Sequence, residues 1–395
     1  MGLTESGVKP GAGEGAANTQ TPFRFYDNRQ KYLAFVNTCN EKAVVARRAA
    51  SELSQLTPRP PAFRMFDAGM GDATVLSRLM SSAHRHFPTV PLLTVAKEIS
   101  LEDVRLGLDK MPDRFYEHPQ TVLVITNLSY ADAPQLMSHK PEAAAKLNWQ
   151  VVRLQGKSTY EYFEQIEAMG PMLTNGWQTR PSETSGNPTP VRPSVLVIFR
   201  EDHEFSLDSV IPKQGVPPGH YDFVLASQPW RARTSASFKA KKILAPLARS
   251  LRPGGKLLTV QSYGDDPGME IVQRLWPSEK PFPVGRHELV GALKAELAQD
   301  PGGFTFADLP DDQAVFRYQM HTLPSEIGDR IGTSTLFAAW NAAIYVNQIE
   351  DERLDEVVTM ATPGRDSYLD VTQEVLHKHG GLWFKDEAFL VMRTS

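Results

Sequence analysis

The sequence predicts an α/β fold in which a mostly parallel sheet carries helices on both faces. Three segments support this prediction: residues 63–86, residues 91–111 and residues 221–260. In each of them, an apolar run of strand length stands next to a segment with the three-to-four residue spacing of a helix. Strands that alternate with helices are typical of a parallel sheet with crossover helices.

The first segment predicts a strand, a tight glycine turn and the start of a helix over 63–76, FRMFDAGMGDATVL. Asp67 stands two residues before Gly69, and Thr74 takes the third-glycine position of the dinucleotide-binding pattern G-x-G-x-x-G. Glycines let backbone amides approach a ligand carboxylate, and an acid at the strand end attracts an ammonium group. The pattern therefore favours a ligand with both groups, or else an ordinary turn between a strand and a helix.

The second segment predicts a further parallel strand that ends in an acid. Residues 91–97 are largely apolar and lead into Glu98. Ser100 and Asp103 then form the pattern of a capping box at the start of a helix. Glu98 is either a ligand-binding acid or a solvated charge at a strand end.

The third segment predicts a strand, a helix and another strand. Residues 221–230 form a buried apolar run that ends near Pro229. Residues 236–251 place alanine, isoleucine and leucine on one helical face, and Pro253 with the following glycines ends that helix before a strand reaching residue 260.

These features, in this order, resemble class I S-adenosylmethionine-dependent methyltransferases. The sequence departs from the family pattern at Ala73, where another glycine often falls. The resemblance implies a Rossmann-like seven-stranded sheet, S-adenosyl-L-methionine as cofactor, and in-line displacement of the methyl group by an acceptor. We expect a small-molecule acceptor, which the sequence does not identify.

The resemblance also implies a set of site residues. Glu98 would accept hydrogen bonds from the ribose hydroxyls, and charge-assisted bonds of this kind are worth about 1.5–3 kcal/mol each. Trp230 is equally consistent with core packing. No catalytic residue is assigned, and no metal site is expected because no metal-binding motif accompanies the histidines. The predicted cofactor-binding residues are Asp67, Ala68, Gly69, Gly71, Asp72, Glu98, Ile99, Asn127 and Ser227, and the predicted substrate-facing residues are Tyr26, Gln228 and Trp230.

Composition restricts the remaining classes. The 395 residues carry a net charge of −4, which gives no electrostatic reason for strong nucleic-acid binding. Cys39 is the single cysteine, so an intrachain disulfide is excluded and a reducing compartment is favoured. Without an apolar run of about 18 residues or a signal-like N-terminus, we expect a cytoplasmic protein with no membrane span.

The chain is expected to divide into three parts. Residues 1–21 predict a disordered tail, and residues 22–61 an N-terminal helical lid with one long amphipathic helix over 28–56. Tyr26, Asp27 and Arg29 are lid candidates, or they only cap and solubilise the helix start. Residues 62–395 form the core, with insertions at about 131–218 and 321–375.

Strand-like runs at 121–126, 150–154 and 194–199 contain the missing third strand. The rest of that insertion extends the sheet, caps the site or forms a dimer surface. A small-residue helix over 333–349 covers the substrate pocket or docks a second subunit in a homodimer. Late in the chain, 285–298 predicts a helix, and 315–320 and 388–393 predict strands.

Other functions stay open. Residues 127–130, Asn-Leu-Ser-Tyr, resemble the signature of nucleic-acid adenine N6-methyltransferases, with Ser129 in place of a proline. His203 is a candidate base if its loop folds over the cleft. A nicotinamide-dependent oxidoreductase is disfavoured by Asp67 and the missing third glycine, and a methyltransferase-like binding or assembly module without turnover is the main alternative.

Overall fold

A computed structural model describes residues 29–183, 188–307, 309–358 and 367–394. Its main feature is a ten-stranded sheet with the order β10-β12-β9-β8-β1-β2-β3-β7-β4, and β11 pairs with β12 beside this path. No helix of the described residues is long and apolar enough to cross a membrane. The strands of the sheet are β1 (Phe63–Asp67), β2 (Leu92–Lys97), β3 (Thr121–Thr126), β4 (Asn148–Leu154), β7 (Ser194–Arg200), β8 (Tyr221–Ser227), β9 (Leu251–Ser262), β10 (Phe304–Phe306), β11 (Val315–Gln319) and β12 (Trp383–Arg393), while β5 (Thr179–Pro181) and β6 (Pro188–Pro190) pair separately.

The centre of the sheet confirms the predicted Rossmann-like fold. Strands β3, β2, β1, β8 and β9 are parallel neighbours, and the antiparallel β12 follows β9. The predicted number of seven strands is wrong, because the first insertion extends one side of the sheet and the short β10 and β11 pair with β12 on the other. Its strand β7 pairs antiparallel with β3, and β4 pairs with β7, so the edge of β3 is covered. An uncovered edge of this kind would be a template for unwanted pairing.

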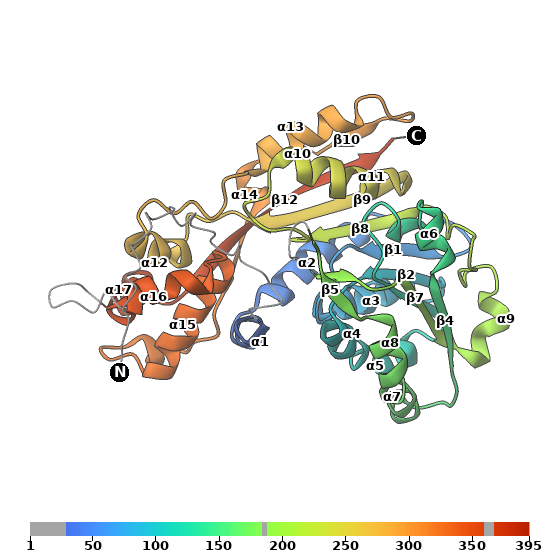
Figure 1. Cartoon of the computed structure of the whole chain (residues 1–395), viewed down its shortest axis with the longest axis horizontal. Helices are drawn as coiled ribbons and strands as arrows, with labels where there is room; N and C mark the ends of the chain where they lie inside the picture. Colours follow the sequence, from blue (N-terminus) through green and yellow to red (C-terminus); the bar gives the residue numbers. More distant parts are fainter. Residues whose placement is uncertain (1–28, 184–187, 308, 359–366, 395) are drawn as a thin grey trace, which may run out of the picture.

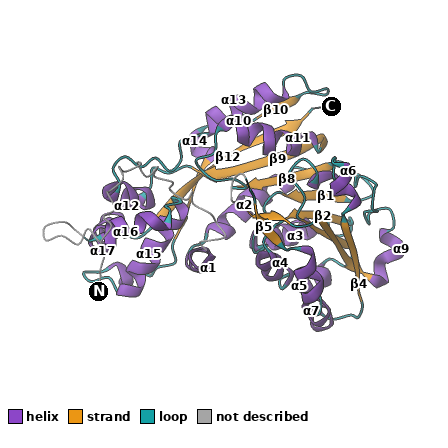
Figure 2. Ribbon diagram, viewed as in Figure 1, coloured by secondary structure: helices purple, strands orange, loops and turns teal. Residues whose placement is uncertain are grey.

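Helices cover both faces of the sheet (Figure 2). The helices α3 (Thr74–His86), α4 (Leu101–Leu108), α5 (Met111–Glu117), α7 (Thr159–Glu167) and α8 (Gly170–Gly176) contribute to one apolar core, together with α2 (Glu41–Leu53). The helices α10 (Ala236–Lys239), α11 (Ala245–Arg249) and α13 (Arg286–Leu297) contribute to the core on the other face. A π-helical stretch, Ala240–Leu244, joins α10 to α11. Short helices α6 (Pro141–Ala145), α9 (Glu204–Leu207) and α14 (Asp311–Ala314) lie in the connections.

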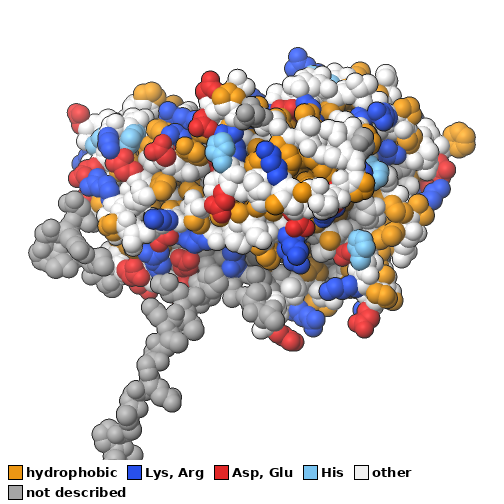
Figure 3. All heavy atoms as spheres, turned by 90° about the horizontal axis from the view of Figure 1, so that it is seen from above, with side chains coloured by type: hydrophobic (Ala, Val, Ile, Leu, Met, Phe, Trp, Pro, Cys, Tyr) orange, Lys and Arg blue, Asp and Glu red, His pale blue; other side chains and the backbone are white. Residues whose placement is uncertain are grey.

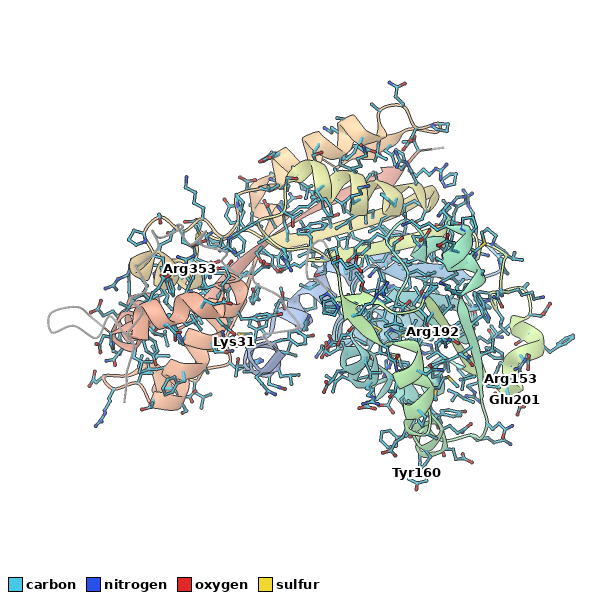
Figure 4. All side chains as sticks on the ribbon, viewed as in Figure 1. Lys31, Arg153, Tyr160, Arg192, Glu201 and Arg353 are labelled. Carbon is cyan, nitrogen blue, oxygen red and sulfur yellow. The ribbon has the colours of Figure 1, made fainter. Side chains whose placement is uncertain are left out.

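A group of helices, which we call the helical layer, stands beside the sheet at the end of β12 that is remote from the C-terminus (Figure 1). It consists of α12 (Pro267–Leu275), α15 (Thr333–Val346), α16 (Leu354–Val358) and α17 (Tyr368–His379). α1 (Arg29–Thr38) packs against α15, and Lys31, labelled in Figure 4, forms an ion pair with Asp351 in the short 3₁₀ turn before α16. The second predicted insertion therefore supplies half of the buried residues of a separate apolar core.

The predicted single helix over 28–56 is wrong, because the chain breaks into α1 and α2 at Cys39 and Asn40. Cys39 forms an isolated bridge with Met320. Asn40 donates its N–H to the Gln319 carbonyl at 3.0 Å and accepts the Gln319 N–H on its side chain at 2.8 Å. Pairing with the end of β11 thus replaces helical hydrogen bonds. The tail 1–21, Tyr26 and Asp27 lie outside the described residues, and Arg29 begins α1.

Candidate functional site

A cavity of about 380 Å³ lies at the carboxyl ends of β1, β2 and β8, where the sheet edge meets the helical layer. Its volume falls within the roughly 300–1,000 Å³ of ligand pockets. In open α/β sheets, ligands bind outside the carboxyl ends of the strands. Two walls enclose it. The glycine-loop wall is formed by the segments that follow β1 and β2, and the assembled wall by α1, α2, β11, the end of α15 and the segment after β8.

The glycine-loop wall owes its shape to two left-handed residues. Gly71 has φ +52°, and a Cβ atom at this position would lie 3.1 Å from the Tyr32 hydroxyl oxygen. Ala73, which precedes α3, has φ +58°. Ala73 stands where the resembled methyltransferases often have a glycine. It adopts the left-handed conformation that is unfavourable for residues with a side chain.

Glu98 ties the two halves of this wall together. Its Oε2 accepts the N–H of Gly71 at 2.9 Å, and its Oε1 accepts those of Ile99 and Ser100 at 2.7 and 2.8 Å. A carboxylate offers about four acceptor positions. Since three are used by the backbone, about one remains for a ligand in the cavity that Glu98 lines.

Asp67 is buried at the end of β1, and its Oδ1 accepts the Gly69 N–H at 3.1 Å. Burial raises the pKa of Asp67 to about 6, and the nearby Glu98 adds to this, while the Gly69 N–H and the Lys42 charge oppose it. A group with this pKa changes charge just below neutral pH. Ala68 and Gly69, the two residues that follow Asp67, line the cavity.

Three predicted cofactor residues, Asp67, Asp72 and Asn127, have structural partners and do not line the cavity. Asp72 caps α3, because its carboxylate accepts the Thr74 N–H at 3.2 Å and the Thr74 hydroxyl at 2.5 Å. The Asn127 amide donates to the carbonyls of Gly176 and Arg192, both at 3.1 Å, and its oxygen accepts the Ser194 N–H at 2.7 Å. Asn127 therefore fastens the first insertion to β3 and has no free amide group for a target base.

The end of β8 and the segment after it place Ser227, Gln228 and Trp230 in the lining of the cavity. Gln228 has φ +50°, a strained value for a residue other than glycine. Its Nε2 donates to Glu41 Oε1 and Asp386 Oδ1, each at 3.3 Å. This amide thus separates two buried carboxyl groups at the base of the cavity.

The sequence analysis missed most of the assembled wall. Burial alone would lower the pKa of Lys42, but Tyr32, Glu41 and Asp72 hold it well above its ordinary value. In the sequence, Tyr32 and Phe35 belong to the apolar face of a predicted helix, and Tyr130 belongs to the Asn-Leu-Ser-Tyr resemblance, so neither pattern places these residues at one cavity. The lining residues that the sequence did not predict include Tyr32, Phe35, Glu41, Lys42, Lys97, Tyr130, Tyr318 and Tyr345.

Two other candidates lie elsewhere or are not found. His203 ends a short 3₁₀ turn after β7 and is not part of the cavity lining. No group of three or more histidine, cysteine or acidic residues that could hold a metal ion occurs in the described part of the chain.

Comparisons with known proteins were made for the sequence and for the fold. No protein-family model matches the chain, and no curated protein has a similar sequence. A solved structure described as a sarcosine dimethylglycine methyltransferase from Galdieria sulphuraria is 11% identical and covers 89% of this chain and 86% of its own, with a TM-score of 0.36.

Two further solved structures are of the same kind. Geranyl diphosphate methyltransferase in complex with GPP and sinefungin is 12% identical over 87% of this chain and 77% of its own, with a TM-score of 0.30. Phosphoethanolamine N-methyltransferase 2 from Haemonchus contortus, in complex with S-adenosyl-L-methionine, is 10% identical over 88% of this chain and 53% of its own, with a TM-score of 0.27. All three are described as methyltransferases. The fold is assigned from the strand order of the sheet, and not from structural similarities with TM-scores this low.

Proposed function

We propose that this chain is an S-adenosylmethionine-dependent methyltransferase that acts on a small-molecule acceptor. The observation that carries the proposal is the joint between Glu98 and Gly71, which holds an acid and a glycine loop together in the lining of one cavity. The cavity has the size of a small-ligand site. Figure 3 shows Lys, Arg, Asp and Glu side chains mixed over one face of the molecule, without the basic stripe of a nucleic-acid interface.

The glycine-loop wall fits the methionyl end of the cofactor. Lys42 lies 5.6 Å from the centre of the Tyr32 ring, and the Tyr32 hydroxyl oxygen accepts the Asp72 N–H at 3.4 Å. Lys42 therefore stands beside the loop as a cation for the carboxylate. Asp67, when ionised, supplies the negative charge for the ammonium group.

Glu98 fits the ribose with one restriction. Because about one acceptor position of its carboxylate is free, one ribose hydroxyl binds there. The second ribose hydroxyl has to share a carboxylate oxygen with a backbone N–H. On Oε2 that N–H belongs to Gly71. Ribose binding is thus coupled to the geometry of the glycine loop.

When bound, the cofactor supplies a methyl group that its sulfonium makes electrophilic. The chain's residues align the acceptor and exclude water. Ser227, Gln228 and Trp230 border the acceptor, and buried aromatic residues of the assembled wall close the cavity. Glu41 lines the cavity and burial raises its pKa, which makes its ionised carboxylate a stronger base and a candidate to take a proton from an acceptor that arrives protonated.

The proposal is tested by calorimetric titration of the full chain with S-adenosylmethionine, S-adenosylhomocysteine and NAD. We expect the first two to bind and NAD not to bind. Glu98→Ala should weaken both, whereas Glu164→Ala, an exposed glutamate on α7, should leave them unchanged. NAD binding alone would support an oxidoreductase, and binding of none of the three would support a binding or assembly module.

A further inference from the structure

Lys97, the last residue of β2, has an environment that the proposed function does not explain. Its side chain lines the cavity, yet only 8% of the residue is exposed. No hydrogen bond or ion pair joins its ammonium group to any residue that the structure describes, and its one contact of note is the Tyr130 ring, 4.5 Å from Nζ to the ring centre. Burial lowers the pKa of Lys97, and Glu98 opposes this.

The Tyr130 ring does not replace a hydrogen-bonding partner. The Tyr130 hydroxyl donates to the Pro229 carbonyl at 2.9 Å, which fixes the ring across the carboxyl ends of the strands. An ammonium group has three N–H donors. A cation–π contact attracts the charge but offers no lone pair to accept a hydrogen bond from these donors. A charge that is largely withdrawn from water and has no partner is costly, and groups perturbed in this way cluster at functional sites.

Lys97 and Lys42 contact different residues of the cavity lining. Lys42 stands beside the glycine loop near Tyr32 and Asp72. Lys97 instead lies against Tyr130, which is bonded to Pro229 of the segment after β8. That segment borders the acceptor in the proposed function, so the two lysines serve different halves of the cavity.

We propose that Lys97 binds an anionic group, a carboxylate or a phosphate, on the methyl acceptor. This inference rests on the proposed function, because only a second ligand beside the cofactor needs a second cation. The anion takes the N–H donors that the protein leaves unpaired, and the Tyr130 ring supports the charge from the opposite side. The acceptor is therefore a small anionic or zwitterionic molecule.

The test is calorimetric titration of the full chain, first with S-adenosylhomocysteine and then, when loaded with it, with inorganic phosphate and with acetate. We expect at least one anion to bind, and its identity tells a phosphate acceptor from a carboxylate acceptor. Lys97→Met should weaken that anion about tenfold or more, with unchanged affinity for S-adenosylhomocysteine. Lys241→Met, at an exposed lysine of the π-helical stretch, is the matched control and should change neither affinity.

The outcomes separate this inference from the proposed function. If S-adenosylhomocysteine does not bind the unaltered chain, the proposed function fails. If it binds but neither anion does, or if the anions bind Lys97→Met as well as the unaltered chain, the assignment of Lys97 is overturned. Loss of S-adenosylhomocysteine binding in Lys97→Met would overturn it as well, because Lys97 would then serve the cofactor.

Thermal unfolding supplies a second readout that needs no ligand. Replacing an unpaired buried cation by an apolar side chain of similar length removes a desolvation penalty. Ligand-free Lys97→Met should therefore unfold at a higher temperature than the unaltered chain, and a lower unfolding temperature would show that Lys97 is paired in the native state. Lys97→Gln, which keeps polarity without charge, takes its place in the titrations if the methionine variant does not fold.

Discussion

The two walls of the cavity are built in different ways. The glycine-loop wall comes from residues 67–72 and 98–100, which follow adjacent parallel strands and are bonded to one another through Glu98. The assembled wall comes from α1, α2, β11, α15 and the segment after β8, which are far apart in the chain. Under the proposed function, the difference means that the cofactor half of the site is fixed by local structure, and that the acceptor half depends on the docking of the helical layer.

The largest expected effect is on the assembled wall. Phe35 is 2% exposed, with its ring centre 5.2 Å from that of Tyr345 and 6.2 Å from that of Tyr318. Phe35→Ala should lower the free energy of unfolding by about 3–5 kcal/mol, since it leaves a cavity where three segments meet. Phe205→Ala, at a side chain that is 98% exposed, is the control. Denaturant unfolding measures both, and equal stabilities would mean that the helical layer does not depend on this contact.

The next effect concerns the glycine-loop wall. Glu98→Ala should weaken S-adenosylmethionine and 5′-methylthioadenosine alike, by about tenfold to a hundredfold, because both ligands carry the ribose and the lost bonds are charge-assisted. Calorimetry compares the two ligands. A loss confined to S-adenosylmethionine would place Glu98 at the methionyl end instead.

Lys42 gives the opposite pattern, since it belongs to the assembled wall but faces the loop. Lys42→Met should weaken S-adenosylmethionine about tenfold, through the lost contact with its carboxylate, and leave 5′-methylthioadenosine unchanged because that ligand has no carboxylate. Calorimetric titrations of Lys42→Met with these two ligands measure the difference. Equal weakening of both ligands would show that Lys42 shapes the wall without binding the methionyl end.

The smallest effect is a pH dependence. Because burial raises the pKa of Asp67 to about 6, its carboxylate is mostly protonated at pH 5 and mostly ionised at pH 7. Affinity for S-adenosylmethionine should therefore fall by up to about tenfold as the pH drops from about 7 to 5. Asp67→Asn should bind weakly with little change over this range. A pH dependence that persists in this variant would assign the titration to another group.

The sequence was sufficient for the parallel core because the strands there are continuous apolar runs, with glycine and proline at their ends. It also placed Glu98, Gly71 and Gln228 at the cavity, since residues that follow parallel strands meet at one sheet edge. Asn127 occupies the same kind of position, but the first insertion uses its amide. No local pattern signals such a contact between residues distant in the chain.

The break between α1 and α2 and the assembled wall were missed for a related reason. The spacing of apolar residues over 28–56 is helical throughout, and the interruption arises only when Asn40 meets Gln319 of β11. Tyr345 and Tyr318 likewise reach the cavity through packing of the late helices and strands. The spacing of apolar residues shows which face of a helix or strand is buried, but it does not show which other element packs against that face.

The most direct test of the account is a crystal structure of the full chain grown with S-adenosylhomocysteine. The account predicts a ribose hydroxyl on Glu98, the amino-acid end between the glycine loop and Lys42, and the sulfur directed toward the segment from Ser227 to Trp230. A ligand bound outside the cavity, or one whose ribose does not reach Glu98, would contradict it.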